Sequence, residues 1–144
     1  MALDFTRLTM PASLDSLQPL TAFVLAGADR VGLAQSERDK LELVLEELLV
    51  NVARYAYQPD SGDVEVAYAA DGTGELVVEI SDNGRAFNIL EAPAPDLSAG
   101  LVDRPIGGLG LLLVRSLAGS VAYRREQDRN RVSFRFPGPQ SPGT

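Results

Sequence analysis

The sequence predicts an α+β fold, a two-layer sandwich in which helices cover one face of a mainly antiparallel sheet. Two helical patterns come early in the chain, and two pairs of alternating strand patterns follow, each pair around a turn-rich segment. The expected order is strand, helix, helix, strand, strand, loop, helix, strand, strand, which suits helices gathered on one face of a sheet. With 144 residues the chain has the size of one ordinary domain.

The first part of the chain predicts a short strand followed by a helix. Apolar and polar residues alternate over residues 5–10 before Pro11, which is typical of an edge strand. Ser13 is a suitable N-cap, and apolar residues then recur at helical spacing until Gly32. We therefore expect a first helix over about residues 14–30 that buries its apolar stripe.

A second, strongly amphipathic helix is expected from Ser36 to about Tyr57. Asp39 lies close to its positive end, where a carboxylate is favourable. The turn-forming residues 58–62 follow and end the helix. Its apolar series comprises Leu41, Val44, Leu45, Leu48, Leu49, Val52 and Ala56.

The middle of the chain predicts a hairpin and then a long loop. Two alternating runs, residues 64–68 and 76–80, flank the turn sequence 71–74 and indicate antiparallel strands. The second run leads directly into Ser81-Asp82-Asn83-Gly84. Residues 88–104 contain prolines and a glycine with little periodicity, and a loop of this length is expected to have a function, such as that of a lid.

The last part predicts a third helix and a second pair of strands. The helix follows a glycine cluster and runs from Leu111 to about Leu117. Residues 121–123 and 132–136 alternate as strands around a turn at 127–130. We expect one domain over residues 1–137 and a disordered tail over 138–144.

Composition excludes several classes of function. Thirteen Lys and Arg residues against twenty Asp and Glu give a net charge of −7, which would repel nucleic acid and anionic membranes. The chain has neither cysteine nor histidine, so carboxylates must provide any acid–base chemistry. The N-terminus does not resemble a signal peptide, and no apolar run approaches the roughly 20 residues that span a bilayer. We expect a cytoplasmic protein.

Three polar side chains fall on one edge of the second helix. At about 100° per residue, Glu47, Asn51 and Arg54 lie within roughly 60° of one another, whereas Glu46 lies about 140° from Asn51. A carboxylate can take a proton from a hydroxyl, and an amide oxygen suits Mg²⁺, so this group would serve phosphoryl transfer. The alternative is a solvated helix face with ordinary polar pairing.

Two turns could bind the base and the phosphates of a nucleotide. Asp82 ends an apolar strand and could accept a hydrogen bond from an exocyclic amine such as that of adenine, while Gly84 permits a close approach. The cluster Gly107-Gly108-Leu109-Gly110 begins a helix, where exposed N–H groups favour phosphate. Each has a simpler interpretation, an ordinary turn for the first and a helix-start turn for the second.

Taken in order, these three segments resemble a known superfamily. Residues 47–51, 82–87 and 107–111 are similar to the N-box and the two glycine boxes of the histidine-kinase-like ATPases. Within that superfamily, Arg104 to Gly110 followed by Leu113-Val114-Arg115-Ser116-Leu117 looks like the bacterial anti-sigma-factor serine kinases. The resemblance covers nearly all of residues 3–136.

The resemblance implies a Bergerat ATP-binding fold in which Mg·ATP lies under a lid. It implies that Glu47 is the general base, that Asn51 binds Mg²⁺, and that Asp82 binds the adenine amine. The other residues expected to contact the nucleotide are Arg54, Tyr55, Gly84, Arg104, Gly107, Gly108, Gly110, Leu111 and Ser133.

The resemblance also implies partners. They are a sigma factor, sequestered by binding, and an anti-anti-sigma protein of the STAS type, phosphorylated on serine by a homodimeric kinase. Tyr55, Ala86 and Gly119-Ser120 depart from the common family pattern. Two alternatives stay open, a non-catalytic switch that binds ATP to control its affinity for a partner, and an interaction domain without nucleotide.

Overall fold

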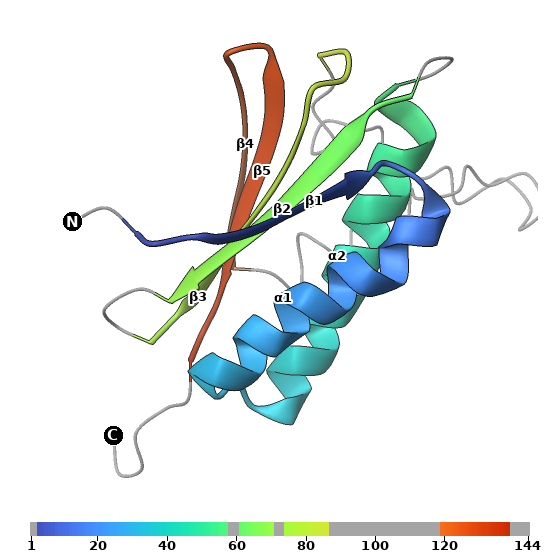
Figure 1. Ribbon diagram of the computed structural model, residues 1–144. Coiled ribbons are helices and arrows are strands. Elements are labelled where there is room, and N and C mark those ends of the chain that lie inside the picture. The colour runs from blue at the N-terminus through green and yellow to red at the C-terminus, as the bar shows by residue number, and fades with distance from the viewer. Residues whose placement is uncertain (1–2, 58–60, 71–73, 87–118, 139–144) are drawn as a thin grey trace, which may run out of the picture.

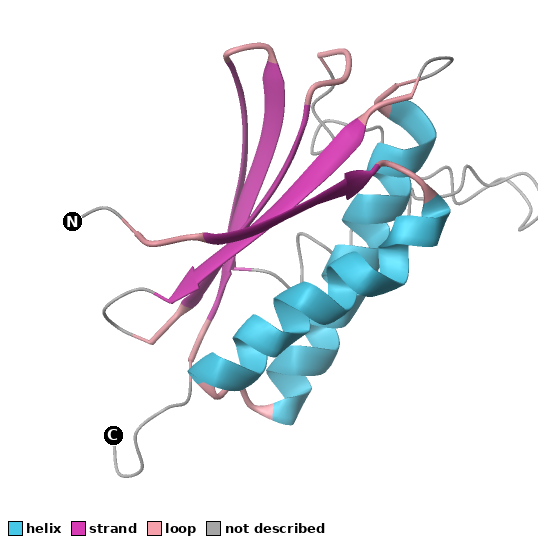
Figure 2. Ribbon diagram, in the orientation of Figure 1, coloured by secondary structure: helices cyan, strands magenta, loops and turns pink. Residues whose placement is uncertain are grey.

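The computed structural model describes residues 3–57, 61–70, 74–86 and 119–138. These residues form two layers, a five-stranded antiparallel sheet with two helices on one of its faces (Figures 1 and 2). The α+β sandwich predicted from the sequence is therefore confirmed. The predicted lid (88–104), glycine cluster (107–110) and third helix (111–117) lie outside the described residues, as does the predicted tail beyond residue 138.

The helical layer differs from the prediction at its ends. A short 3₁₀ helix, η1 (Leu14–Ser16), precedes α1 (Leu17–Val31), so the predicted first helix is two elements, and the Ser13 side chain makes no capping hydrogen bond. The second helix, α2 (Gln35–Tyr55), begins one residue before Ser36 and has Ala34 as its N-cap. Here the Ala34 carbonyl accepts the hydrogen bond from the Arg38 amide, so backbone alone starts the helix. None of the described helices is both long and apolar enough to cross a membrane.

The sheet has the strand order β1-β2-β3-β5-β4, and every neighbouring pair is antiparallel. Its central strand, β3, is buried at six of its seven positions, as expected for a strand with neighbours on both sides. The strands are β1 (Thr6–Pro11), β2 (Asp63–Ala70), β3 (Leu76–Asp82), β4 (Gly119–Glu126) and β5 (Arg129–Phe136).

The turn between β4 and β5 is shorter than the sequence indicated. Only Gln127 and Asp128 form it, and both have positive φ angles, 54° and 60°. Such a two-residue turn matches the twist of the flanking strands, so pairing resumes at once between Glu126 and Arg129. The predicted turn at 127–130 is therefore wrong in its second half, because Asn130 belongs to β5.

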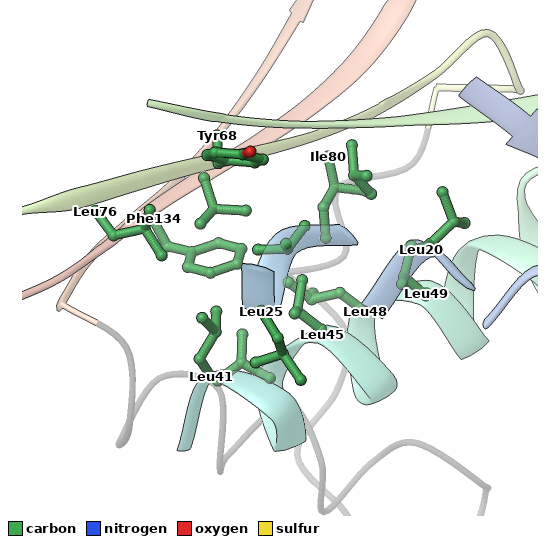
Figure 3. Packing of buried hydrophobic residues seen from close by; sticks show 14 of the residues in the cluster. Leu20, Leu25, Leu41, Leu45, Leu48, Leu49, Tyr68, Leu76, Ile80 and Phe134 are labelled. Atoms are coloured by element: carbon green, nitrogen blue, oxygen red, sulfur yellow. The ribbon is translucent and has the colours of Figure 1, made fainter. Parts of the chain in front are cut away.

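The core fills the space between the helices and the sheet. Leu41, Leu45 and Leu48 project from α2 at intervals of one helical turn, and each is at most 1% exposed. They face Ile80 and Phe134 from the sheet (Figure 3). This packing fixes which edge of α2 is left for polar side chains, the edge that carries Asn51.

Candidate functional site

The polar edge of α2 brings Glu47 and Asn51 together. The Asn51 side-chain amide, Nδ2, donates to the Glu47 backbone carbonyl at 2.7 Å and to Glu47 Oε1 at 3.2 Å. Asn51 is only 6% exposed, whereas Glu47 is half-buried. Because both of these hydrogen bonds use the nitrogen, the amide oxygen is the atom that can serve as an acceptor or a metal ligand.

The neighbours of this pair are arranged differently. Glu46 lies on the opposite flank of α2 and lines a separate hollow with Leu14 and Thr21, so the adjacent carboxylates face different surroundings. Arg54 is half-buried in the last turn of α2, and within the described residues no hydrogen bond or ion pair joins its guanidinium to Glu47 or Asn51. The structure thus shows a direct hydrogen bond between Glu47 and Asn51, and the place of Arg54 on the same edge stays a prediction.

Asp82 is a buried carboxylate at the end of β3. It is 6% exposed, and its Oδ1 accepts hydrogen bonds from the Gly84 amide at 2.8 Å and from Asn130 Nδ2 at 2.9 Å. No hydrogen bond from another described residue reaches Oδ2. The carboxylate is therefore held in one orientation by two donors on one oxygen, which leaves the other oxygen to accept from a ligand.

Gly84 lies against the C-terminal end of α2. A Cβ atom added there would lie 2.2 Å from the Ala56 carbonyl oxygen, and the next residue, Arg85, donates its amide to that same oxygen at 3.1 Å. The sequence-based interpretation assigned the close approach at Gly84 to a ligand. Within the described residues, contact with the helix backbone already requires glycine.

A narrow cleft separates α2 from the ends of β3 and β5. Its walls are apolar except for Asp82 and Asn130, an arrangement suited to a flat heterocycle that offers a hydrogen-bond donor at its edge. The enclosed part measures about 20 Å³, which is too small to hold a whole ring. The described side chains would therefore contact only the edge of such a ring. The lining residues are Leu48, Val52, Ala56, Ile80, Asp82, Asn130 and Val132.

Residues 10–136 match the family model described as the histidine kinase-like ATPase domain. The chain belongs to this family. The protein named serine-protein kinase RsbW from Bacillus thuringiensis (strain Al Hakam) is 23% identical over 125 residues, which cover 84% of this chain and 78% of that protein. The protein of the same name from Bacillus mycoides (strain KBAB4) is 21% identical over the same shares.

Solved structures agree with this histidine kinase-like fold. The RsbU and RsbW domains of Rv1364c from Mycobacterium tuberculosis superpose with a TM-score of 0.68 at 15% identity, covering 96% of this chain. The match takes up 33% of that longer chain. The blue-light activated histidine kinase EL346 from Erythrobacter litoralis gives a TM-score of 0.56 at 18% identity, over 82% of this chain and 41% of its own.

Asn130, which helps to orient Asp82 in this ATPase domain, was not among the residues predicted from the sequence. Asn130 is 5% exposed, pairs with Asp82 across the β3–β5 ladder and donates to its carboxylate. The missed signal was the two-residue turn at 127–128, since a tight turn places residue 130 within the strand.

Ser133 does not lie with Asp82 and Asn130 at the cleft. Buried and partly exposed residues alternate along β5, and Ser133 shares the outer face of the sheet with Glu79 and Arg124, where the three line another hollow. Asn130 and Val132 face the cleft instead. The other predicted nucleotide contacts, Arg104, Gly107, Gly108, Gly110 and Leu111, lie outside the described residues.

Tyr57 links α2 to the turn after β3. Its hydroxyl donates to the Asp63 carbonyl at 2.5 Å and accepts the Asn83 amide at 2.7 Å. Burial raises the pKa of this hydroxyl above its ordinary value, and the Asn83 amide opposes that rise. The neutral phenol is thus favoured, and it holds the turn that carries Asp82 against the helix. Tyr55, two residues before Tyr57, is half-buried at the C-terminal end of α2.

Proposed function

We propose that this chain is an ATP-dependent serine/threonine protein kinase that acts as an anti-sigma factor. In this role it phosphorylates an anti-anti-sigma partner of the STAS type and sequesters a sigma factor, and so regulates transcription. The observation that carries the proposal is the contact between Glu47 and Asn51, which sets a carboxylate beside an amide on one edge of α2. The relatives named serine-protein kinase RsbW support the same activity.

The donor set fits Mg·ATP. Asp82 would accept the amine of adenine at the end of an apolar cleft, and the amide oxygen of Asn51 would bind Mg²⁺, which needs few protein ligands when phosphate and water supply the rest. Bound Mg²⁺ would neutralise charge on the phosphates. Arg54 and Tyr55 stay predictions as nucleotide contacts, whereas Ser133 lines the hollow on the outer face of the sheet and not the cleft.

Glu47 would act as the general base. Its carboxylate would take the proton of the partner's serine hydroxyl while that oxygen forms a bond to the γ-phosphorus of ATP and the bond to the bridging oxygen of ADP breaks. The half-buried position of Glu47 suits this role, since a base for a protein substrate must be reachable from solvent. We further propose that the kinase is a homodimer in the cytoplasm.

Phosphorylation of a purified STAS-type partner by the full chain tests the proposal. Phosphoserine, followed with labelled ATP and located by mass spectrometry, is expected with the natural chain. Glu47→Gln should lower the rate by about 10²–10⁴-fold, the usual contribution of a general base. Glu46→Gln is the matched control, because it removes the adjacent carboxylate on the other flank of α2, and it should leave the rate unchanged.

Two results would overturn the kinase assignment. One is the absence of phosphoserine with the natural chain, and the other is full activity in Glu47→Gln. Nucleotide-dependent binding of the partner without transfer would favour the non-catalytic switch instead. In that case Asn51→Ala should abolish complex formation while Glu47→Gln leaves it intact.

A further inference from the structure

Asn130 lies at the centre of a polar network that joins three strands. Its Nδ2 donates to Asp82 Oδ1 at 2.9 Å and to the Arg85 carbonyl at 2.7 Å. Its Oδ1 accepts from the Tyr123 hydroxyl at 2.7 Å and from Arg125 Nη1 at 3.2 Å. Both ends of this buried amide are therefore used, which is how a polar side chain can be buried without a large penalty.

The network fixes which end of the amide faces Asp82. A guanidinium can only donate hydrogen bonds, so the atom of Asn130 next to Arg125 must be the oxygen. The nitrogen then faces Asp82, where it donates to a carboxylate oxygen. Arg125 also donates to the Gly84 carbonyl at 2.9 Å, so the same guanidinium ties the β4–β5 hairpin to the turn that carries Asp82.

The orientation of Asp82 has a consequence for the choice of base. With Oδ1 occupied by donors from Gly84 and Asn130, the carboxylate is held as an acceptor. An acceptor attracts the amine at C6 of adenine and repels the carbonyl oxygen at C6 of hypoxanthine or guanine. Without Asn130 the carboxylate would lose one of the two donors that fix its orientation, and its second oxygen would no longer be held toward the C6 substituent.

We propose that Asn130, oriented by Tyr123 and Arg125, is a positioning residue that makes the site select 6-amino over 6-oxo purine nucleotides. The inference rests on the proposed function, in which Asp82 receives the base. It adds that the selectivity depends on residues of β4 and β5 that act through Asp82.

The test compares the affinities for ATP and for inosine 5′-triphosphate, which carries a carbonyl oxygen in place of the C6 amine. Titration calorimetry on the full chain gives both dissociation constants, and their ratio measures selectivity. Asn130→Ala should lower the preference for ATP about tenfold, and Tyr123→Phe, which keeps the ring and removes one donor, about threefold. Glu126→Gln, an exposed change in the same hairpin, is the matched control and should leave the ratio unchanged.

The ratio separates positioning from a merely structural role. A destabilised site would lose affinity for both nucleotides in proportion, and an unchanged ratio in Asn130→Ala and Tyr123→Phe would overturn the inference. If Asn130→Ala fails to fold, Tyr123→Phe decides alone. Asp82→Asn distinguishes the positioning role of Asn130 from the base-reading role of Asp82. A changed ratio in Asp82→Asn with unchanged ratios in the other two variants refutes only the role of Asn130, whereas an unchanged ratio in Asp82→Asn refutes the base-reading role of Asp82 as well.

Discussion

The edge of α2 and the turn after β3 are built in different ways, although both supply a carboxylate to the candidate site. On α2, Glu47 and Asn51 are four positions apart, and one helix brings them together. At the turn, Asp82 is held by Asn130, 48 positions away, and Gly84 by Arg125, 41 positions away. The first arrangement needs only a helix, whereas the second needs the strands to pair in one register.

This difference predicts how the two regions respond to substitution. A change at Glu47 on the edge of α2 should alter chemistry with little effect on folding, because its contact with Asn51 is local and its own side chain is half-exposed. A change at the turn should alter both, because its contacts hold β3, β5 and the end of α2 together. The free energy of unfolding, measured for variants in both regions, therefore tests this difference.

The largest effect on stability is expected for Gly84→Ala. The added methyl group would lie 2.2 Å from the Ala56 carbonyl oxygen and 2.7 Å from its carbon, both backbone atoms that cannot turn away. We expect a loss of about 1–3 kcal/mol in the free energy of unfolding, the usual cost of overpacking. Urea denaturation measures it, and a loss below about 0.5 kcal/mol would contradict the tight contact between the turn and α2.

The contrast between the two regions also explains what the sequence could predict. The fold class, both long helices and all five strands follow from hydrophobic periodicity, and the pairing of Glu47 with Asn51 follows from helical spacing. Asn130 could not be found in the same way, because its place depends on a turn of two residues rather than four. A one-residue change in strand position moves a side chain to the other face of the sheet.

Ser133 and Gly84 illustrate the same limit. Strand alternation alone does not say which parity of β5 faces the helices, and only the packing of Val132 and Phe134 in the core sets Ser133 on the outer face. For Gly84 the sequence indicated a close approach but not its partner. The contact with Ala56 is made between segments that lie far apart in the chain, and spacing within either segment does not reveal it.

Tyr57→Phe should have an intermediate effect, since this residue joins the two regions. The change removes the hydroxyl that donates to Asp63 and accepts from Asn83. We expect a loss of about 0.5–1.5 kcal/mol in the free energy of unfolding at neutral pH. Denaturant titration checks the value, and an unchanged stability would show that the turn after β3 does not depend on this link to α2.

The same substitution should change the dependence of stability on pH. Burial raises the pKa of Tyr57 in the folded state above its unfolded value of about 10. The folded state then binds the proton more tightly, so this contribution is complete below the unfolded pKa and is lost as pH rises through the folded pKa. Stability of the natural chain should fall more steeply above about pH 10 than that of Tyr57→Phe, and equal slopes would contradict the prediction.

The smallest effect on stability is expected for Glu47→Gln. The glutamine keeps an oxygen that can accept the Asn51 amide at the 3.2 Å separation seen for Glu47, and the position is half-exposed, so the free energy of unfolding should stay within about 0.5 kcal/mol of the natural chain. The same variant is expected to lose most of the phosphoryl transfer proposed above. A large loss of stability would mean that the edge of α2 is coupled to the fold as tightly as the turn is. A small one, measured beside Gly84→Ala, would show that this domain keeps its proposed base on a part of the structure that folding does not require.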